Sequence, residues 1–184
     1  MLMLLGTSPG QTFAVSAFTP SLLAGLHLTQ SRLGLAYMLG TLFAAVPLTF
    51  VGPLADRHGL KRIAWIVIVA LAVACLFASS VNGFYGLLAA FFLLRFLGQG
   101  SLTLLSSNTT AMWFRSKIGR VSAVLSIGSA IAFAWVPQWL ATCIDAIGWR
   151  ATYQVLAAIL ILVLLPLVIL LYRNGPEELG QFVD

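Results

Sequence analysis

Apolar stretches, each about as long as a lipid bilayer is thick, dominate this 184-residue chain. A helix needs roughly 20 mainly apolar residues to cross the hydrocarbon core, where its backbone must satisfy its own hydrogen bonds. Such stretches lie near residues 2–25, 33–52, 62–80, 83–111, 119–143 and 150–172. The sequence therefore predicts an all-α membrane protein with about six transmembrane helices.

The composition supports this prediction and excludes a soluble class. Hydrophobic residues make up 60% of the chain and charged residues 8%, against about 45–50% and about 25% in soluble domains. In a soluble protein, the net charge of +5 would suggest binding to nucleic acid. Here the basic residues fall in short connections between the apolar stretches, so we expect no nucleic-acid partner. We expect one transmembrane domain over residues 1–172 and the start of a cytoplasmic linker over 173–184. Cys75 and Cys143 have no metal-ligand spacing, so neither a metal nor another cofactor is expected.

The basic residues are distributed unequally between the two sides. One side has only Arg32 and Arg150. The other collects Arg57, Lys61, Arg62, Arg115, Lys117, Arg120 and Arg173. Because cytoplasmic loops carry the excess of Lys and Arg, that second side is predicted to be cytoplasmic, together with both termini.

Polar side chains form stripes on four of the predicted helices. At about 100° per residue, the stripe of the fourth helix spans roughly 80°. The stripes comprise Arg95, Gln99, Thr103, Ser106 and Thr110 on the fourth helix; Ser8, Thr12, Ser16 and Thr19, flanked by Gln11, on the first; Ser122, Ser126 and Ser129 on the fifth; and Tyr37 with Thr41 on the second. The third and sixth helices carry none and are predicted to be peripheral and lipid-facing. The other four should surround a common polar volume, unless their Ser and Thr side chains only bond to their own helix carbonyls.

Arg95 is the strongest single candidate for a functional residue. It lies about 12 residues, or roughly 18 Å, from the outer end of its helix, where an arginine costs about 2.5–3.5 kcal/mol. None of the six stretches contains Asp or Glu, so an anionic solute such as a carboxylate would supply the counter-charge. The alternative is that Arg95 bonds helix carbonyls, Gln99 or water structurally. The substrate-binding candidates are Arg95, Gln99, Thr12, Gln11, Tyr37 and Ser126.

The segment GPLADRHGLKR, Gly52 to Arg62, resembles the signature loop of the major facilitator superfamily, with Leu60 where a basic residue is usual. The resemblance implies a conformational latch formed by Gly52, Asp56, Arg57, Gly59 and Lys61. In addition, LLRFLGQGS around Arg95 resembles the fourth-helix arginine motif of that family. MWFRSKIGR and GWRATY are similar to connections in its organic-anion members, such as the monocarboxylate and oxalate/formate carriers.

The resemblance implies two inverted three-helix repeats, which together make half of the family's fold. In agreement, Asp56-x-x-Gly59-x-Lys61 recurs as Asp145-x-x-Gly148-x-Arg150. Because family members have two such halves, we expect a fragment or half-transporter that lacks a C-terminal six-helix half. The implied function is secondary active transport of a small solute, an organic anion, by alternating access in a bacterial inner membrane.

Two other functions remain open at this point. A non-transporting membrane subunit would use the polar stripes as protein contacts. An intramembrane hydrolase is suggested by the G-x-S-x-G pattern of Gly6 to Gly10, but that elbow needs a strand-to-helix turn and a nearby base. The histidines, His27 and His58, are predicted on opposite sides, so no catalytic residue is expected. Close helix packing is the better interpretation of Gly6, Gly10, Gly98 and Gly100.

Overall fold

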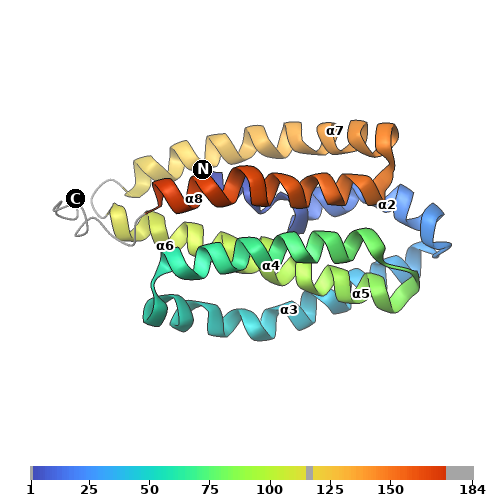
Figure 1. Cartoon of the computed structure of the whole chain (residues 1–184), viewed down its shortest axis with the longest axis horizontal. Coiled ribbons are helices and arrows are strands. Elements are labelled where there is room, and N and C mark those ends of the chain that lie inside the picture. The colour runs from blue at the N-terminus through green and yellow to red at the C-terminus, as the bar shows by residue number, and fades with distance from the viewer. Residues whose placement is uncertain (1, 115–117, 173–184) are drawn as a thin grey trace.

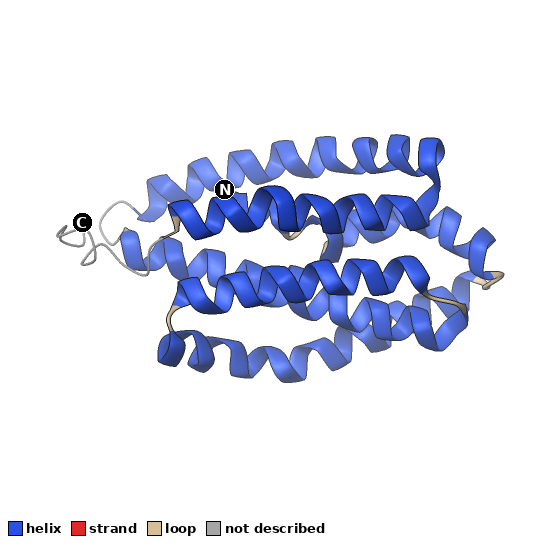
Figure 2. Ribbon diagram, in the orientation of Figure 1, coloured by secondary structure: helices blue, strands red, loops and turns tan. Residues whose placement is uncertain are grey.

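A computed structural model describes residues 2–114 and 118–172 of the chain, and these contain helices but no strand (Figure 2). The first half holds α1 (Leu2–Gly6), the 3-10 helix η1 (Ser8–Gly10), α2 (Thr12–Leu26), α3 (Gln30–His58) and α4 (Leu60–Ser80). The second half holds α5 (Gly83–Leu94), the π-helix η2 (Arg95–Leu102), α6 (Thr103–Trp113), α7 (Ile118–Ile159), the π-helix η3 (Leu160–Leu164) and α8 (Leu165–Leu171). The predicted all-α class is confirmed. The predicted linker over 173–184 and the basic residues Arg115 and Lys117 lie outside the described residues.

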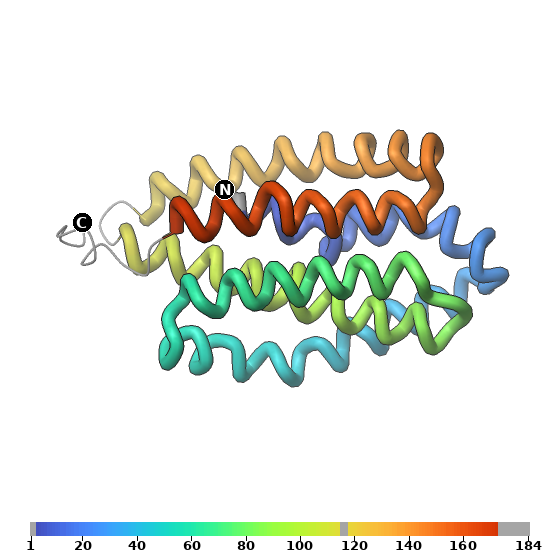
Figure 3. The backbone as a smooth tube through the Cα atoms, in the orientation of Figure 1, coloured from blue at the N-terminus to red at the C-terminus, as the bar shows by residue number. Residues whose placement is uncertain are grey.

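Four helices in the described part of the chain are long and apolar enough to cross a membrane, whereas about six were predicted. They are Gln30–His58, Leu60–Ser80, Gly83–Trp113 and Ile118–Leu171. The last has 54 residues, but Gly148 has non-helical backbone angles within it. Figure 3 shows the chain reversing inside α7 and running back along the bundle. A count of six crossings stays a prediction.

The first predicted helix is interrupted, which leaves α2 with only 15 residues. Pro9 and Gly10 form the short helix η1 between α1 and α2. A Cβ atom on Gly10 would lie 2.2 Å from the Leu94 carbonyl oxygen and 3.0 Å from the Gly98 Cα. The interruption therefore lies where η1 crosses η2 at backbone contact. Here the predicted packing role of Gly10 and Gly98 is confirmed.

The connections between helices gather at the two ends of the bundle (Figure 1). One end holds the turn between α3 and α4, the end of α6, the start of α7 and the end of α8. The other holds the turns from α2 to α3 and from α4 to α5, together with the reversal inside α7. This matches the predicted grouping of connections, while the cytoplasmic assignment of the first end stays a prediction from the charges.

One cluster of buried hydrophobic residues runs through the bundle from Met3 to Val168. Phe18 of α2 stacks on Tyr153 of α7, with ring centroids 4.1 Å apart. The predicted lipid-facing character of the third helix is only partly correct. α4 is the most buried of the four candidate spans, with 56% of the residues in its most apolar part buried inside the protein. The reason is that α4 packs against both α5 and α7. The face it leaves exposed is apolar and carries Trp65, Ile66, Val73, Leu76 and Phe77.

Candidate functional site

Arg95, at the junction of α5 and η2, holds three helical segments together through hydrogen bonds. Its Nε donates to Thr41 Oγ1 of α3 at 3.1 Å. Its Nη1 donates to Thr12 Oγ1 of α2 at 3.2 Å and to the Gly10 carbonyl oxygen of η1 at 3.4 Å. Thus residues far apart in the sequence meet at one half-buried cation.

The interruption at Gly10 is what makes its carbonyl available to Arg95. The backbone N–H groups of Ala14 and Val15 both bond to the Gln11 carbonyl, so the Gly10 carbonyl is left without its α-helical partner. Such freed carbonyls are tolerated at membrane depth only where protein or a water-filled cavity surrounds them. The Gly10 carbonyl was not among the predicted site residues, although Pro9 followed by Gly10 is the sequence signal for such an interruption.

Tyr37 of α3 completes this group of residues, which we call the arginine cluster: Arg95, Gly10, Thr12, Tyr37 and Thr41. The Tyr37 hydroxyl shares a hydrogen bond of 3.1 Å with Thr12 Oγ1. Its ring lies 4.9 Å from Arg95 Cζ, within range of a cation–π interaction. Three of the predicted substrate-binding residues, Arg95, Thr12 and Tyr37, therefore lie together.

The guanidinium of Arg95 is only partly satisfied by the protein. A guanidinium has five N–H donors, and those on Nε and Nη1 are directed to the three acceptors above. The Nη2 group has no acceptor among residues 2–114 and 118–172. The acidic residues in this part of the chain, Asp56 and Asp145, are exposed and neither pairs with Arg95. Within the described residues, the positive charge of Arg95 therefore has no acidic counter-charge.

Gln11 and Gln99 lie in a neighbouring pocket of about 260 Å³, bounded by η1, η2 and α7. Gln11 Nε2 donates to Thr7 Oγ1 at 2.9 Å. By contrast, Gln99 Oε1 and Thr103 Oγ1 are buried with no hydrogen-bond partner in the described structure. Two further predicted residues are thus brought together, one turn away from the arginine cluster.

Ser126 does not join either group. It lines a different pocket of about 330 Å³ with Ser106, Ser122 and Ser129. That pocket shares Ser129 with the Gln99 pocket and shares Ser106 with a third pocket of about 300 Å³ that reaches Trp113 and Tyr172. In place of the predicted single polar volume, the structure therefore has a row of adjoining pockets. Residues of α7, the fifth predicted helix, line this row, whereas no residue of α3, the second predicted helix, is among its lining residues.

Several predicted stripe residues bond nearby backbone carbonyls, in their own helix or, for Ser8, in the preceding helix α1. The hydroxyls of Ser8, Ser16, Thr19, Thr110 and Ser129 donate to carbonyls three or four residues earlier. For Ser16 and Thr19 this agrees with the alternative interpretation, whereas Ser8, Thr110 and Ser129 also line the pockets described above. In the described residues the Ser8 hydroxyl bonds the Leu5 carbonyl and His58 bonds the Leu54 carbonyl, so no hydrogen bond joins Ser8 to His58.

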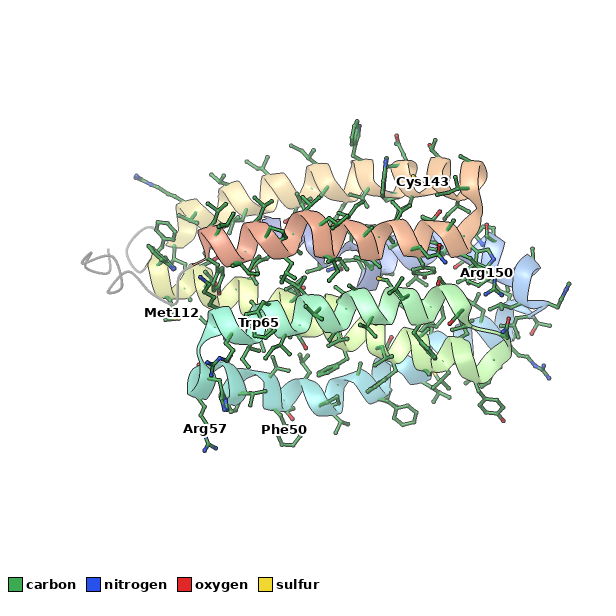
Figure 4. The ribbon with its side chains drawn as sticks, in the orientation of Figure 1. Phe50, Arg57, Trp65, Met112, Cys143 and Arg150 are labelled. Atoms are coloured by element: carbon green, nitrogen blue, oxygen red, sulfur yellow. The ribbon has the colours of Figure 1, made fainter. Side chains whose placement is uncertain are left out.

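The predicted latch segment lies almost entirely on helices and not in a loop. Gly52, Asp56 and Arg57 belong to the last turns of α3, while Lys61 lies in the first turn of α4. Gly59 alone makes the reversal, with φ 87° and ψ 137°. A Cβ on Gly52 would meet nothing within 4 Å in the described structure, and the latch role of Gly52 stays a prediction. Arg57 projects away from the bundle (Figure 4).

Arg150, predicted only as a basic residue of a connection, caps the end of α4. It donates to the carbonyl oxygens of Ser79 and Val81 at 2.8 and 3.2 Å, and to Asn82 Oδ1 at 3.1 Å. These groups form the C-terminal end of α4, where carbonyls lack helical partners and the helix dipole favours a cation. Arg150 lies beside that turn in Figure 4. The sequence feature that singles out Arg150 is the pattern Asp145-x-x-Gly148-x-Arg150, which repeats Asp56-x-x-Gly59-x-Lys61.

The interrupted first helix, the half-buried arginine and the signature segment agree with the fold of a membrane transporter. The chain matches the Major Facilitator Superfamily over residues 1–183. It belongs to this family and is an integral membrane protein of a class that carries out transmembrane transport. Family members are in general transporters and not enzymes. None of the curated proteins compared with the chain matches it.

Proposed function

We propose that this chain provides the anion-binding part of a secondary active transporter that moves a small organic anion by alternating access. The observation that carries this proposal is the uncompensated charge of Arg95, whose Nη2 group lacks a protein acceptor. Carboxylates are the natural partners of a guanidinium, because two parallel N–H groups match their two oxygens. The similarity of MWFRSKIGR and GWRATY to organic-anion carriers agrees with this substrate class.

The row of adjoining pockets supports passage of a hydrophilic solute. From Gln99 it continues through Ser129 and Ser106 to Tyr172. Hydroxyl groups along this row can solvate a polar molecule in a region where lipid cannot. We therefore propose that a solute passes along this row between Gln99, four residues after Arg95, and one membrane surface, the cytoplasmic one according to the charges.

The resemblance to the family supplies the remaining part of the proposal. A second six-helix half would close the other side of the substrate site. The latch residues Gly52, Asp56, Arg57, Gly59 and Lys61 would contact that half during the transport cycle. Asp56 is exposed at the end of α3, where its carboxylate can face a helix N-terminus of the partner half. The proposed location is a bacterial inner membrane with both termini cytoplasmic.

Binding of radiolabelled oxalate, acetate and lactate to the purified chain in nanodiscs tests this proposal. Binding requires only the arginine cluster, whereas uptake also requires the moving halves. Arg95→Ala should weaken binding by about tenfold or more, because a hydrogen bond to a charged group contributes about 1.5–3 kcal/mol. Arg32→Ala, which removes an exposed arginine at the start of α3, is the matched control and should bind normally.

A non-transporting membrane subunit is the second candidate, and one observation favours it. Arg95 bonds three segments of the chain, as a purely structural residue would. In that case Arg95→Ala would disturb folding or assembly, and no anion would bind the wild-type protein. Monodisperse Arg95→Ala protein that has lost anion binding would exclude this candidate.

A further inference from the structure

A separate pocket of about 240 Å³ is lined by two irregular helical segments, η1 and η3. Its other lining residues come from α1, from both arms of α7 before and after the reversal at Gly148, and from the start of α8. Regular helices pack closely by fitting ridges of side chains into grooves. The 3-10 turn of η1 and the π-turns of η3 both depart from that regular surface. The pocket thus follows from the backbone of these two segments.

The lining of this pocket is apolar. Among the described residues that line it, only Ser8 and Trp139 carry polar side-chain atoms, and none is charged. The Ser8 hydroxyl already donates to the Leu5 carbonyl at 2.6 Å. An apolar cavity of about 150 Å³ stays free of water and binds a hydrocarbon such as benzene. The pocket therefore favours a hydrocarbon occupant over water or a polar solute.

The mouth of the pocket lies on the outer surface of the bundle. Four of the lining residues have exposed side chains: Leu5, Trp139, Ile159 and Val163. From residue 156 to residue 171 every residue is apolar, so this part of the chain presents no polar side chain to its surroundings. The rim of a protein–protein interface is polar, whereas a surface in contact with hydrocarbon is not. The residues around the mouth therefore favour lipid as its neighbour.

The pocket lies near the middle of the membrane. Asp145 and Arg150 flank the reversal at Gly148, and these charged residues place the reversal at a membrane surface. Trp139 precedes Gly148 by nine residues and Ile159 follows it by eleven, which corresponds to roughly 14 and 17 Å along the two arms. The hydrocarbon core is about 30 Å thick. At this depth the surrounding lipid consists of the terminal parts of acyl chains and not of headgroups.

We propose that this pocket, which we call the acyl pocket, binds the terminal segment of one acyl chain of a membrane phospholipid. The acyl pocket is separate from the proposed anion site, because no residue of the arginine cluster lines it. The two sites nevertheless share the interrupted helix. Pro9 lines the acyl pocket, and the carbonyl of the next residue, Gly10, accepts from Arg95. A bound chain therefore packs against the segment that positions the arginine cluster.

Photolabelling of the purified chain in nanodiscs tests the acyl pocket. The probe is a phosphatidylcholine with a diazirine close to the methyl end of one acyl chain, and mass spectrometry of peptides locates the labelled residues. Label should appear on Pro9, Leu156 or Leu160, which line the pocket and are buried, so lipid that merely surrounds the protein does not touch them. A phosphatidylcholine with the diazirine beside the glycerol should label none of these three residues, because its reactive group stays near the membrane surface.

A variant that fills the acyl pocket provides the second part of the test. Val136 lines the pocket on the first arm of α7, so Val136→Trp should abolish labelling of the three buried residues. Val124→Trp, at an exposed position of the same arm outside the pocket, is the matched control and should be labelled as the wild type is. Both variants should keep the label on exposed residues such as Leu162.

Two results would overturn the acyl pocket. One is wild-type protein in which the chain-end probe labels exposed residues alone, which would mean that protein side chains or nothing at all fill the pocket. The other is labelling of Pro9, Leu156 or Leu160 that persists in Val136→Trp. If Val136→Trp does not fold, the comparison of the two probes on the wild-type protein decides. Neither result depends on anion binding, so the proposed function is tested separately.

Discussion

Gly59 and Gly148 share one unusual backbone conformation, with φ 87° and ψ 137° at the first and φ 82° and ψ 159° at the second. Each lies three residues after an aspartate and two before a basic residue. A positive φ with an extended ψ is almost closed to residues with a Cβ. The repeated sequence pattern therefore corresponds to a repeated backbone reversal, once at each end of the bundle (Figure 1).

Alanine at either reversal should destabilise the protein. Gly148→Ala would meet no atom within 4 Å, so its cost is backbone strain alone, about 1–3 kcal/mol. Gly59→Ala should cost a similar amount. Thermal unfolding in detergent should show a lower Tm for both variants than for Gly52→Ala, whose helical position leaves room for a methyl group. Equal Tm values for Gly148→Ala, Gly59→Ala and Gly52→Ala would show that a Cβ atom causes no backbone strain at the two reversals.

Alanine at the crossing of η1 and η2 should damage stability and anion binding together. The added Cβ in Gly10→Ala would lie 2.2 Å from the Leu94 carbonyl oxygen, and a backbone atom cannot rotate away. Separation of the two segments should cost about 1–3 kcal/mol and lengthen the Arg95 bond to the Gly10 carbonyl. The control is Gly34→Ala, which meets nothing within 4 Å. Normal Tm and anion affinity in Gly10→Ala would contradict the close crossing.

The sequence predicted the helical class and three of the five residues of the arginine cluster as site residues, because polar side chains on apolar helices must converge. It could not predict the interruption at Gly10, which depends on backbone contact with a segment more than 80 residues away. Nor could it show that Ser126 lines a separate pocket, since helical periodicity fixes a face of a helix but not the neighbour of that face. The burial of α4 was missed for a related reason: an apolar surface packs equally well on lipid and on protein.

Removal of the Arg150 side chain should loosen the end of α4. Arg150→Ala would leave the carbonyls of Ser79 and Val81 without their side-chain donor, at a cost of about 1–3 kcal/mol. Hydrogen exchange should become faster for the last turn of α4 and the turn into α5. Arg32→Ala provides the control at another exposed connection. Unchanged exchange at these amides in Arg150→Ala would show that the cap contributes nothing.

Tyr37 should influence anion binding through its ring more than through its hydroxyl. Tyr37→Phe loses the hydrogen bond to Thr12 but keeps the ring beside the Arg95 guanidinium, so oxalate affinity should fall less than about fivefold. Tyr37→Leu removes both interactions and should weaken binding further, since a cation–π contact contributes about 0.5–2 kcal/mol. If Tyr37→Phe and Tyr37→Leu bind oxalate with equal affinity, the ring of Tyr37 contributes nothing to anion binding.

The most direct test of the central claim is to locate a bound carboxylate beside Arg95. A bromine-labelled carboxylate that does not alkylate thiols, 4-bromobenzoate, can be diffused into crystals of the protein and located by the anomalous scattering of bromine. The account predicts a bromine peak beside the arginine cluster, a carboxylate oxygen roughly 2.8 Å from Arg95 Nη2, and loss of the peak in Arg95→Gln. Bromine bound only elsewhere, with Nη2 bonded to a protein oxygen, would contradict the assignment of Arg95 as the anion-binding residue.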